Sequence, residues 1–209
     1  LVEPGTVMMA VVAGTGPDVN IMGTVVEPIN YAVRKAVISL NDFEGFDEVI
    51  KDFHPQMLTP LSFMGRTYAL PETESFPVMF YRKDIFEELG LKVPATWDEV
   101  YDLIHELQAH NMQFGPYVDL YPVLLYQNGG EYYANNGEYS LLNSYSSVKA
   151  FNQWTRFFMD YGLPLEYDFL NRFRTGEVPI AIQDFGMCNS LAVFAPEIKN
   201  DWAMTLVPG

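Results

Sequence analysis

Residues 117–145 hold the side chains whose chemistry is most readily inferred from their types and spacing. Seven tyrosines occur there among carboxylates, amides and a Gly-Gly pair. Rings that bear a hydroxyl can stack on the C–H faces of a sugar, while carboxylates and amides hydrogen-bond its rim. A tyrosine-rich surface over an apolar core would explain most of the same rings individually. We expect two or three of them to face a ligand, with Tyr121 first and Asp119 beside it.

Paired carboxylates suggest a second possible chemistry, glycoside hydrolysis, because that reaction uses two carboxyl groups as acid and nucleophile. The candidate pairs are Glu72 with Glu74 and Asp119 with Glu131. Glu72 and Glu74 alternate along an extended chain and would point to opposite sides. The sequence shows no Ser-His-Asp grouping, phosphate-binding loop or cluster of metal ligands. We therefore expect a protein that is not an enzyme and needs no cofactor or metal, with a carbohydrate-active hydrolase as the alternative.

Composition narrows the range of partners. The 209 residues are 49% hydrophobic and 19% charged, which is typical of an ordered globular chain, and the formal net charge is −15. That charge argues against nucleic acid as a partner, because a phosphate backbone would be repelled. Cys188 is the single cysteine, so no internal disulfide is possible. The chain begins at Leu1 rather than Met, and we expect it to be a piece of a longer protein.

The stretch 65–99 combines several local signals. We expect a short strand at 68–70, a polar link at 72–76 and a buried strand at 77–81. A helix over 85–89 should follow and end at Gly90, which can adopt the left-handed conformation. Thr96 and Glu99 have the spacing of a capping box at the start of the next helix. Trp97 lies on the apolar face of that helix and should be structural.

The remaining elements alternate in the manner of an α/β protein. The apolar run 7–12 predicts a buried helix, and residues 19–22 predict a short strand followed by a loop. Residues 42–53 predict an acidic surface segment. The other expected helices are 28–37, 147–162, 168–175 and 189–194, and the other expected strands are 178–183 and 203–207. Trp154 lies on the apolar face of the helix at 147–162, so we expect it in the core rather than at a ligand.

At this point the sequence resembles a known family. Residues 79–107, MFYRKDIFEELGLKVPATWDEVYDLIHEL, resemble the bacterial extracellular solute-binding proteins that serve ABC importers, a family that includes maltose-binding protein. Three weaker landmarks agree in order: Gly16-Pro17-Asp18, Asn128-Gly129-Gly130 and the segment 173–180. The resemblance implies an α/β fold of the periplasmic-binding-protein-like type II, with two lobes joined by a hinge. Residues 1–75 would be a partial lobe 1, and residues 76–209 a near-complete lobe 2.

The same resemblance implies a function and a site. It implies an extracytoplasmic protein, extracellular or periplasmic and anchored as a lipoprotein, that delivers a small-molecule ligand to the membrane subunits of an ABC transporter. Family positions for a stacking Trp and an Asp-Arg pair hold other residues here, so the ligand is expected to be a saccharide other than maltose. A sensor or scaffold built on the same lobes is a further alternative. The expected ligand-binding residues are Met22, Thr24, Glu72, Ser75, Phe76, Asp119, Tyr121, Asp184, Phe185 and Met187.

Overall fold

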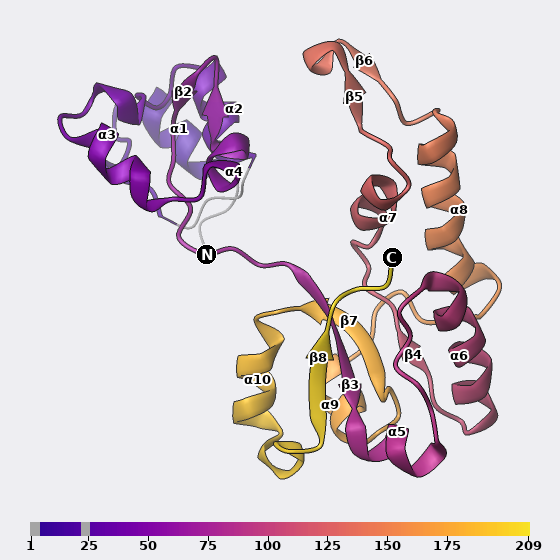
Figure 1. Cartoon of the computed structure of the whole chain (residues 1–209). Coiled ribbons are helices and arrows are strands. Elements are labelled where there is room, and N and C mark those ends of the chain that lie inside the picture. The colour runs from indigo at the N-terminus through magenta and orange to yellow at the C-terminus, as the bar shows by residue number, and fades with distance from the viewer. Residues whose placement is uncertain (1–4, 22–25) are drawn as a thin grey trace. The chain divides into compact units, whose positions relative to one another are not determined.

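The computed structural model of the chain describes residues 5–21 and 26–209. Two compact units make up the chain, Leu1–Glu74 and Ser75–Gly209, which we call unit 1 and unit 2. Figure 1 traces the chain from one unit to the next. The division falls in the polar link, one residue before the boundary expected from the sequence. The predicted site residues Met22 and Thr24 lie outside the described residues.

Unit 2 is built on a four-stranded mixed sheet. Its order is β4 (Phe114–Gly115), β7 (Ile180–Asp184), β3 (Pro77–Arg82) and β8 (Trp202–Thr205). β4 pairs with β7 in parallel, whereas β3 is antiparallel to both β7 and β8. β3 therefore lies in the interior of the sheet, which agrees with its unbroken apolar sequence. The strands predicted at 77–81, 178–183 and 203–207 are confirmed with small shifts of their ends.

Helices cover both faces of this sheet, because alternate residues of each interior strand are buried on opposite sides. Met79, Ile180 and Ile182 belong to one core cluster, with α6 (Trp97–Ala109) and α8 (Tyr145–Met159). Phe80 and Ala181 belong to the other, with α9 (Phe169–Arg174) and α10 (Met187–Phe194). α5 (Lys83–Leu89) follows β3 directly, and α7 (Tyr121–Gln127) packs against α8. A small hairpin, β5 (Tyr133–Ala134) and β6 (Tyr139–Ser140), flanks η4 (Asn135–Gly137), and η5 (Pro196–Ile198) precedes β8.

In unit 2, the residues predicted to end or begin helices make the expected local contacts. Gly90 has φ 65° and ends α5 in the left-handed conformation. Thr96 and Glu99 make both hydrogen bonds of the capping box of α6. Trp97 is buried in the core, as predicted, and its Nε1 donates to Gln127 Oε1 at 2.8 Å.

Unit 1 consists of short helices and one tight hairpin. Its helical elements are α1 (Thr6–Val12), α2 (Glu27–Val33), η1 (Leu40–Asp42), α3 (Phe46–Val49), η2 (Ile50–Asp52), α4 (Pro55–Leu58) and η3 (Thr59–Leu61). The hairpin joins β1 (Ser62–Phe63) to β2 (Arg66–Thr67). Met64 and Gly65 form its two-residue loop with φ 49° and 74°, the signs of a type I′ turn.

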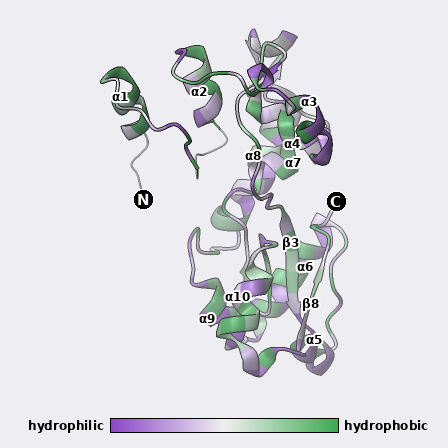
Figure 2. Ribbon diagram, turned by 90° about the vertical axis from the view of Figure 1, so that its left-hand side faces the viewer, coloured by the Kyte–Doolittle hydropathy of each residue, from purple (hydrophilic) through white to green (hydrophobic). Residues whose placement is uncertain are grey.

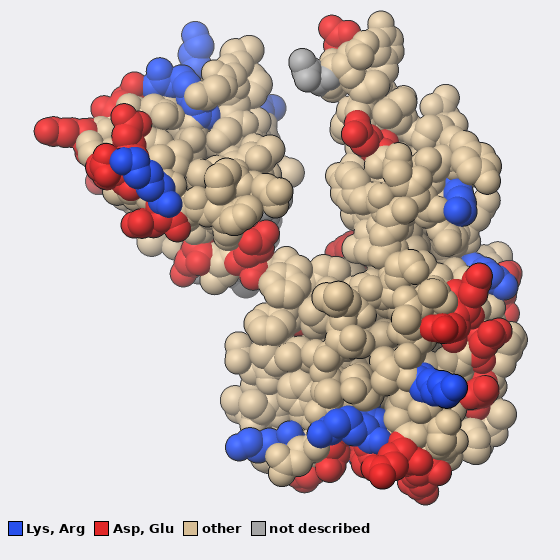
Figure 3. Space-filling model, in the orientation of Figure 1, with Lys and Arg blue, Asp and Glu red and all other residues tan. Residues whose placement is uncertain are grey.

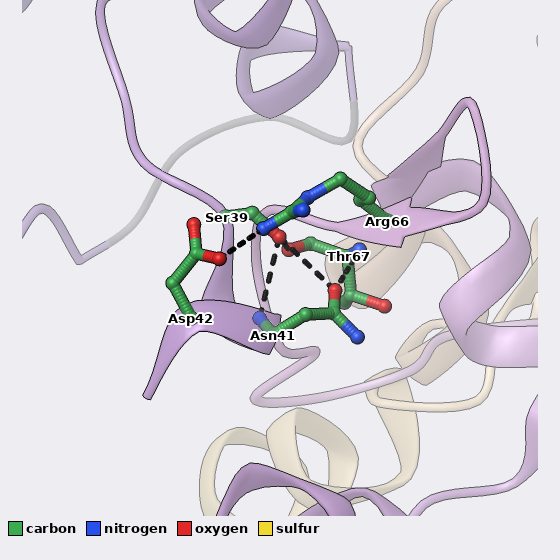
Figure 4. Close-up of polar contacts among 5 residues, drawn as sticks. All are labelled: Ser39, Asn41, Asp42, Arg66 and Thr67. Carbon is green, nitrogen blue, oxygen red and sulfur yellow. Dashed lines mark hydrogen bonds and ion pairs between the residues drawn. The ribbon is translucent and has the colours of Figure 1, made fainter. Parts of the chain in front are cut away.

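A polar cluster ties η1 to this hairpin (Figure 4). The backbone N–H of Thr67 donates to Asn41 Oδ1 at 2.8 Å, and Arg66 forms an ion pair with Asp42. The hydroxyl of the buried Ser39 lies 3.3 Å from the carbonyl oxygen of Thr67. Ser39 and Thr67 are the buried members of this cluster, and these hydrogen bonds satisfy the Ser39 hydroxyl and the backbone groups of Thr67.

Three predictions for unit 1 are wrong. Helix α1 forms, but none of its side chains, all within the described residues, is buried, and Val12 is 77% exposed. Residues 19–21, the described part of the strand predicted at 19–22, form no strand, because no partner strand lies beside them in the described chain. The strand predicted at 68–70 is instead the hairpin at 62–67, since the turn at Met64-Gly65 sets its position. α2 is also shorter than predicted, because Lys35 adopts φ 56° shortly after its end.

The surface of unit 1 is acidic where the sequence predicts it. Acidic side chains gather over α3 and the neighbouring turns in Figure 3, and α3 carries Asp47 and Glu48 in its first turn. No helix within the described residues is long and apolar enough to span a bilayer. Groups of His, Cys, Asp or Glu with the geometry of a metal site are likewise absent from the part of the chain that the structure describes.

Candidate functional site

One edge of the unit 2 sheet collects the ends of several strands. β4 and β7 are parallel and both run toward this edge; Gly115 pairs with Ala181, and β7 continues past that pair to Asp184. β3 runs the opposite way and begins there, at Pro77 paired with Asp184. In α/β sheets the carboxyl ends of strands are where ligands bind, because the loops that leave them are free to present side chains. We call this region, with the residues that flank it, the strand edge.

Asp184 and Tyr117 are joined at the strand edge. The Tyr117 hydroxyl donates to Asp184 Oδ1 at 3.0 Å. Burial, followed by the hydrogen bond and negative charge of Asp184 and the charge of Asp119, raises the pKa of Tyr117 to about 12. Tyr117 therefore stays protonated at neutral pH and keeps donating. The second carboxylate oxygen, Oδ2, has no hydrogen-bond partner among the described residues and can accept a donor from a ligand.

Phe76 and Phe185 form a stacked pair at the same edge. The N–H of Phe185 donates to the carbonyl of Phe76 at 2.9 Å, which extends the β3–β7 ladder by one step. Their ring centroids lie 5.2 Å apart with an interplanar angle of 17°. The two residues remain 51% and 40% exposed, so an apolar stacked surface faces the solvent. Such a surface is suited to the C–H face of a sugar or polyol.

Asp119 and Tyr121 lie instead along a depression between α7 and α8, which we call the α7–α8 depression. It has a volume of about 550 Å³, and Tyr132, Phe151 and Trp154 also line it. The Tyr121 hydroxyl lies 2.6 Å from Oγ of Ser147, a fully buried residue of α8. The hydroxyl of Tyr121 is therefore engaged in holding the two helices together. Its ring remains available along the depression.

The other predicted site residues are placed separately. Glu72 is exposed in unit 1, and Ser75 is exposed in unit 2 beside Phe76. Met187 begins α10 half-buried against the second core cluster. The structure thus brings together Phe76, Asp184 and Phe185 at the strand edge, and Asp119 with Tyr121 at the depression.

Several residues of these sites were not among the predicted ligand-binding residues, including Tyr132 and Phe151 of the depression. Tyr117 follows Gly115-Pro116 at the end of β4, and β4 is only two residues long, too short to recognise from its sequence. Trp154 was expected in the core. It does pack against the core cluster, but its Nε1 donates to the carbonyl of Val118 at 3.1 Å and its ring lines the depression.

Comparison with known proteins identifies the family. The family model described as bacterial extracellular solute-binding protein matches residues 5–209. This chain belongs to that family. A binding protein of Brucella abortus (strain 2308) is 29% identical over 203 residues, covering 90% of this chain and 49% of that relative. The multiple sugar-binding protein of Streptococcus mutans is 35% identical over 94 residues, covering 44% of this chain and 20% of that protein.

Solved structures of such proteins share the fold. An ABC transporter solute-binding protein from Thermotoga lettingae, bound to α-D-tagatose, matches with a TM-score of 0.77 at 21% identity, covering 97% of this chain and 56% of that one. The GacH receptor of Streptomyces glaucescens matches with a TM-score of 0.75 at 19% identity, covering 98% of this chain and 55% of that one. The chain therefore has the mixed α/β fold of these binding proteins. It spans about half the length of the relatives it matches.

Proposed function

We propose that the full-length protein is the substrate-binding component of an ABC importer and that it binds a sugar or polyol without altering it. Membership of the solute-binding family supports the class of protein. Solved structures with the same fold are bound to α-D-tagatose, ribitol and D-mannitol, which supports the class of ligand. The partners would be the membrane subunits of the transporter. The location would be extracytoplasmic, with a lipid anchor on the full-length protein.

The strand edge is the observation that carries this proposal. A sugar or polyol needs an apolar surface for its C–H groups and polar atoms for its hydroxyls. Phe76 and Phe185 offer the first, since their stacked rings are half exposed. Asp184 offers the second, because Tyr117 occupies only one of its carboxylate oxygens. Ser75 precedes Phe76 in the chain and is exposed to solvent.

The proposal assigns unit 1 to part of lobe 1 and unit 2 to lobe 2. The polar link at 72–76 would then be a hinge strand, with Glu72 before the division between the units and Phe76 after it. Ligand bound at the strand edge would favour the closed form by the contacts that only the closed form completes. Met22, Thr24 and Glu72 remain proposed lobe 1 contacts on the strength of the family resemblance.

Titration of the full-length protein with a panel of sugars and polyols tests the function. D-Tagatose, D-mannitol, ribitol and maltose form the panel, and calorimetry reports binding while chromatography reports any chemical change. We expect at least one compound to bind and to be recovered unchanged. Conversion of a bound compound would instead indicate a hydrolase. If no compound of the panel binds, the saccharide assignment is overturned and a sensor or scaffold is favoured.

The location of the site is tested with matched variants of two exposed phenylalanines. Phe185→Ala removes half of the stacked pair and should weaken binding about tenfold, which corresponds to roughly 1.4 kcal/mol. Phe194→Ala truncates a ring at the end of α10 that is more exposed, at 66% against 40% for Phe185, and should leave the affinity unchanged. Equal affinities of the two variants would remove the strand edge from the site while leaving the proposed function in place.

A further inference from the structure

The α7–α8 depression contains a continuous row of aromatic rings. Tyr132 contacts Tyr121 with ring centroids 6.1 Å apart, Tyr121 contacts Phe151 at 6.4 Å, and Phe151 contacts Trp154 at 5.9 Å. The rings meet at interplanar angles of 53° to 76° rather than in a parallel stack, and Phe151 remains 50% exposed. A volume of about 550 Å³ lies within the range of roughly 300–1,000 Å³ common for small-molecule sites.

Few polar groups in this depression are free to bind a ligand. The Tyr121 hydroxyl is bonded to Ser147, and the Trp154 indole N–H donates to the carbonyl of Val118. Among the described residues, the Asp119 carboxylate and the Tyr132 hydroxyl are the lining groups without a hydrogen-bond partner. A saccharide would bury several hydroxyls here with too few partners, and each unsatisfied group costs free energy. The lining therefore disfavours a sugar.

The same residues are suited to an organic cation whose charge is surrounded by apolar groups. The faces of aromatic rings attract cations, and a nearby carboxylate adds Coulombic attraction. Trp154 is held beside Asp119 because its N–H bonds the residue that precedes Asp119. The chain also carries a formal net charge of −15, which favours the approach of cations over anions.

We propose that the α7–α8 depression binds a small organic cation of the quaternary-ammonium type, held against Phe151 and Trp154 and beside Asp119. This site adjoins the strand edge, since the charge of Asp119 also acts on Tyr117, but the two sites differ in chemistry. Its occupancy does not depend on the proposed transport function, since no residue of the Phe76–Phe185 pair contributes to it.

Choline and its neutral isostere 3,3-dimethylbutan-1-ol are the probes. The two molecules have nearly the same shape and differ in charge, so comparing them isolates the cation. The indole N–H signals of Trp97, Trp154 and Trp202 are followed by NMR in the 209-residue protein, with sodium chloride matching the ionic strength. Choline should shift the Trp154 signal saturably. Trp97, buried in the core with its N–H bonded to Gln127, provides the internal control.

Variants of two exposed aspartates complete the test. Asp119→Asn should weaken choline about fivefold, while Asp102→Asn, on the polar face of α6, should leave binding unchanged. The alcohol should bind at least about fivefold more weakly than choline to the unsubstituted protein. Equal binding of the alcohol, or no saturable shift of Trp154, would overturn the proposal. A sugar from the panel that shifted Trp154 at lower concentration than choline would also overturn it.

Discussion

Arg82 is a cation held almost out of water at the end of β3. It is 8% exposed, and its guanidinium donates to both carboxylate oxygens of Asp84 at 2.8 and 2.6 Å. Its remaining terminal nitrogen donates to the carbonyls of Phe173 and Arg174, each at 3.0 Å. One side chain thus joins the start of α5 to the end of α9. Bidentate geometry of this kind makes a charge-assisted contact stronger than an ordinary surface ion pair.

The Arg82–Asp84 pair predicts a specific pH dependence of stability. The hydrogen bonds from Arg82 hold the pKa of Asp84 below its usual value. A carboxyl with a lowered folded-state pKa stabilises the fold above its unfolded pKa of about 4, and this contribution is lost as the pH falls through the folded value. Asp84→Asn should therefore reduce the acid sensitivity of the unfolding midpoint below about pH 4. At pH 7 the free energy of unfolding should fall by about 1 kcal/mol, because Asp84 is partly exposed.

Asp102→Asn is the control for this measurement. Asp102 is exposed on α6, so its replacement should leave both the midpoint at pH 7 and its acid dependence unchanged. Urea unfolding between pH 3 and pH 7 provides the comparison. An Asp84→Asn variant with the full acid sensitivity of the parent protein would contradict the assigned role.

At the scale of elements, the start of α6 shows how a few residues can determine a boundary. The N–H of Glu99 donates to Thr96 Oγ1 at 3.3 Å, and Glu99 Oε2 accepts from the N–H groups of Ala95 and Thr96 at 2.7 and 3.2 Å. These bonds satisfy amides that have no partner within the helix. Thr96→Ala should lower the free energy of unfolding by about 1 kcal/mol, as measured by chemical denaturation.

A second threonine, Thr155, provides a control, because its replacement by alanine is not expected to destabilise the protein. Thr155 lies inside α8, where its hydroxyl bonds back to the carbonyl of Phe151. Alanine has the higher helix propensity there, so Thr155→Ala should be neutral or stabilise by about 0.5 kcal/mol. If both substitutions cost the same, the loss at Thr96 would reflect side-chain truncation rather than capping.

These elements also show what the sequence could and could not predict. The capping box, Gly90 and the apolar run of β3 were predicted because each depends on residues within a few positions. The strand at 19–22 was wrong because a strand needs a partner that no local pattern supplies. At the candidate site, Asp184 was proposed from the end of a recognisable strand and Phe185 from the family resemblance. Tyr117 did not, since its contact with Asp184 joins residues 67 positions apart.

At the scale of the whole molecule, unit 1 exposes apolar side chains of a kind that are normally buried in a folded domain. α1 is largely hydrophobic in Figure 2, yet Met9 and Val12 are mostly exposed. Val19, Ile21 and Ile38 are exposed as well. The chain spans about half the length of its relatives, and burial of apolar surface stabilises by roughly 25 cal/mol per Å². We expect the remaining part of the full-length protein to cover this surface.

Hydrogen exchange tests that expectation. Amides of α1 should exchange more slowly in the full-length protein than in the 209-residue chain, because packing suppresses local opening. Amides of α6, whose apolar face is already buried, should exchange at the same rate in both. Identical protection of α1 in the two proteins would show that the rest of the chain packs elsewhere.

The hydrogen bond between the backbones of Phe76 and Phe185 has a consequence for how this protein can change over evolution. Because the bond joins two main-chain groups, it forms with any residue at position 76 and with any residue except proline at position 185. The side chains at these positions are free to vary while the link between the units stays attached to the sheet. Substitutions at positions 76 and 185 can therefore change which ligand is preferred without removing the hydrogen bond that attaches the link to the sheet.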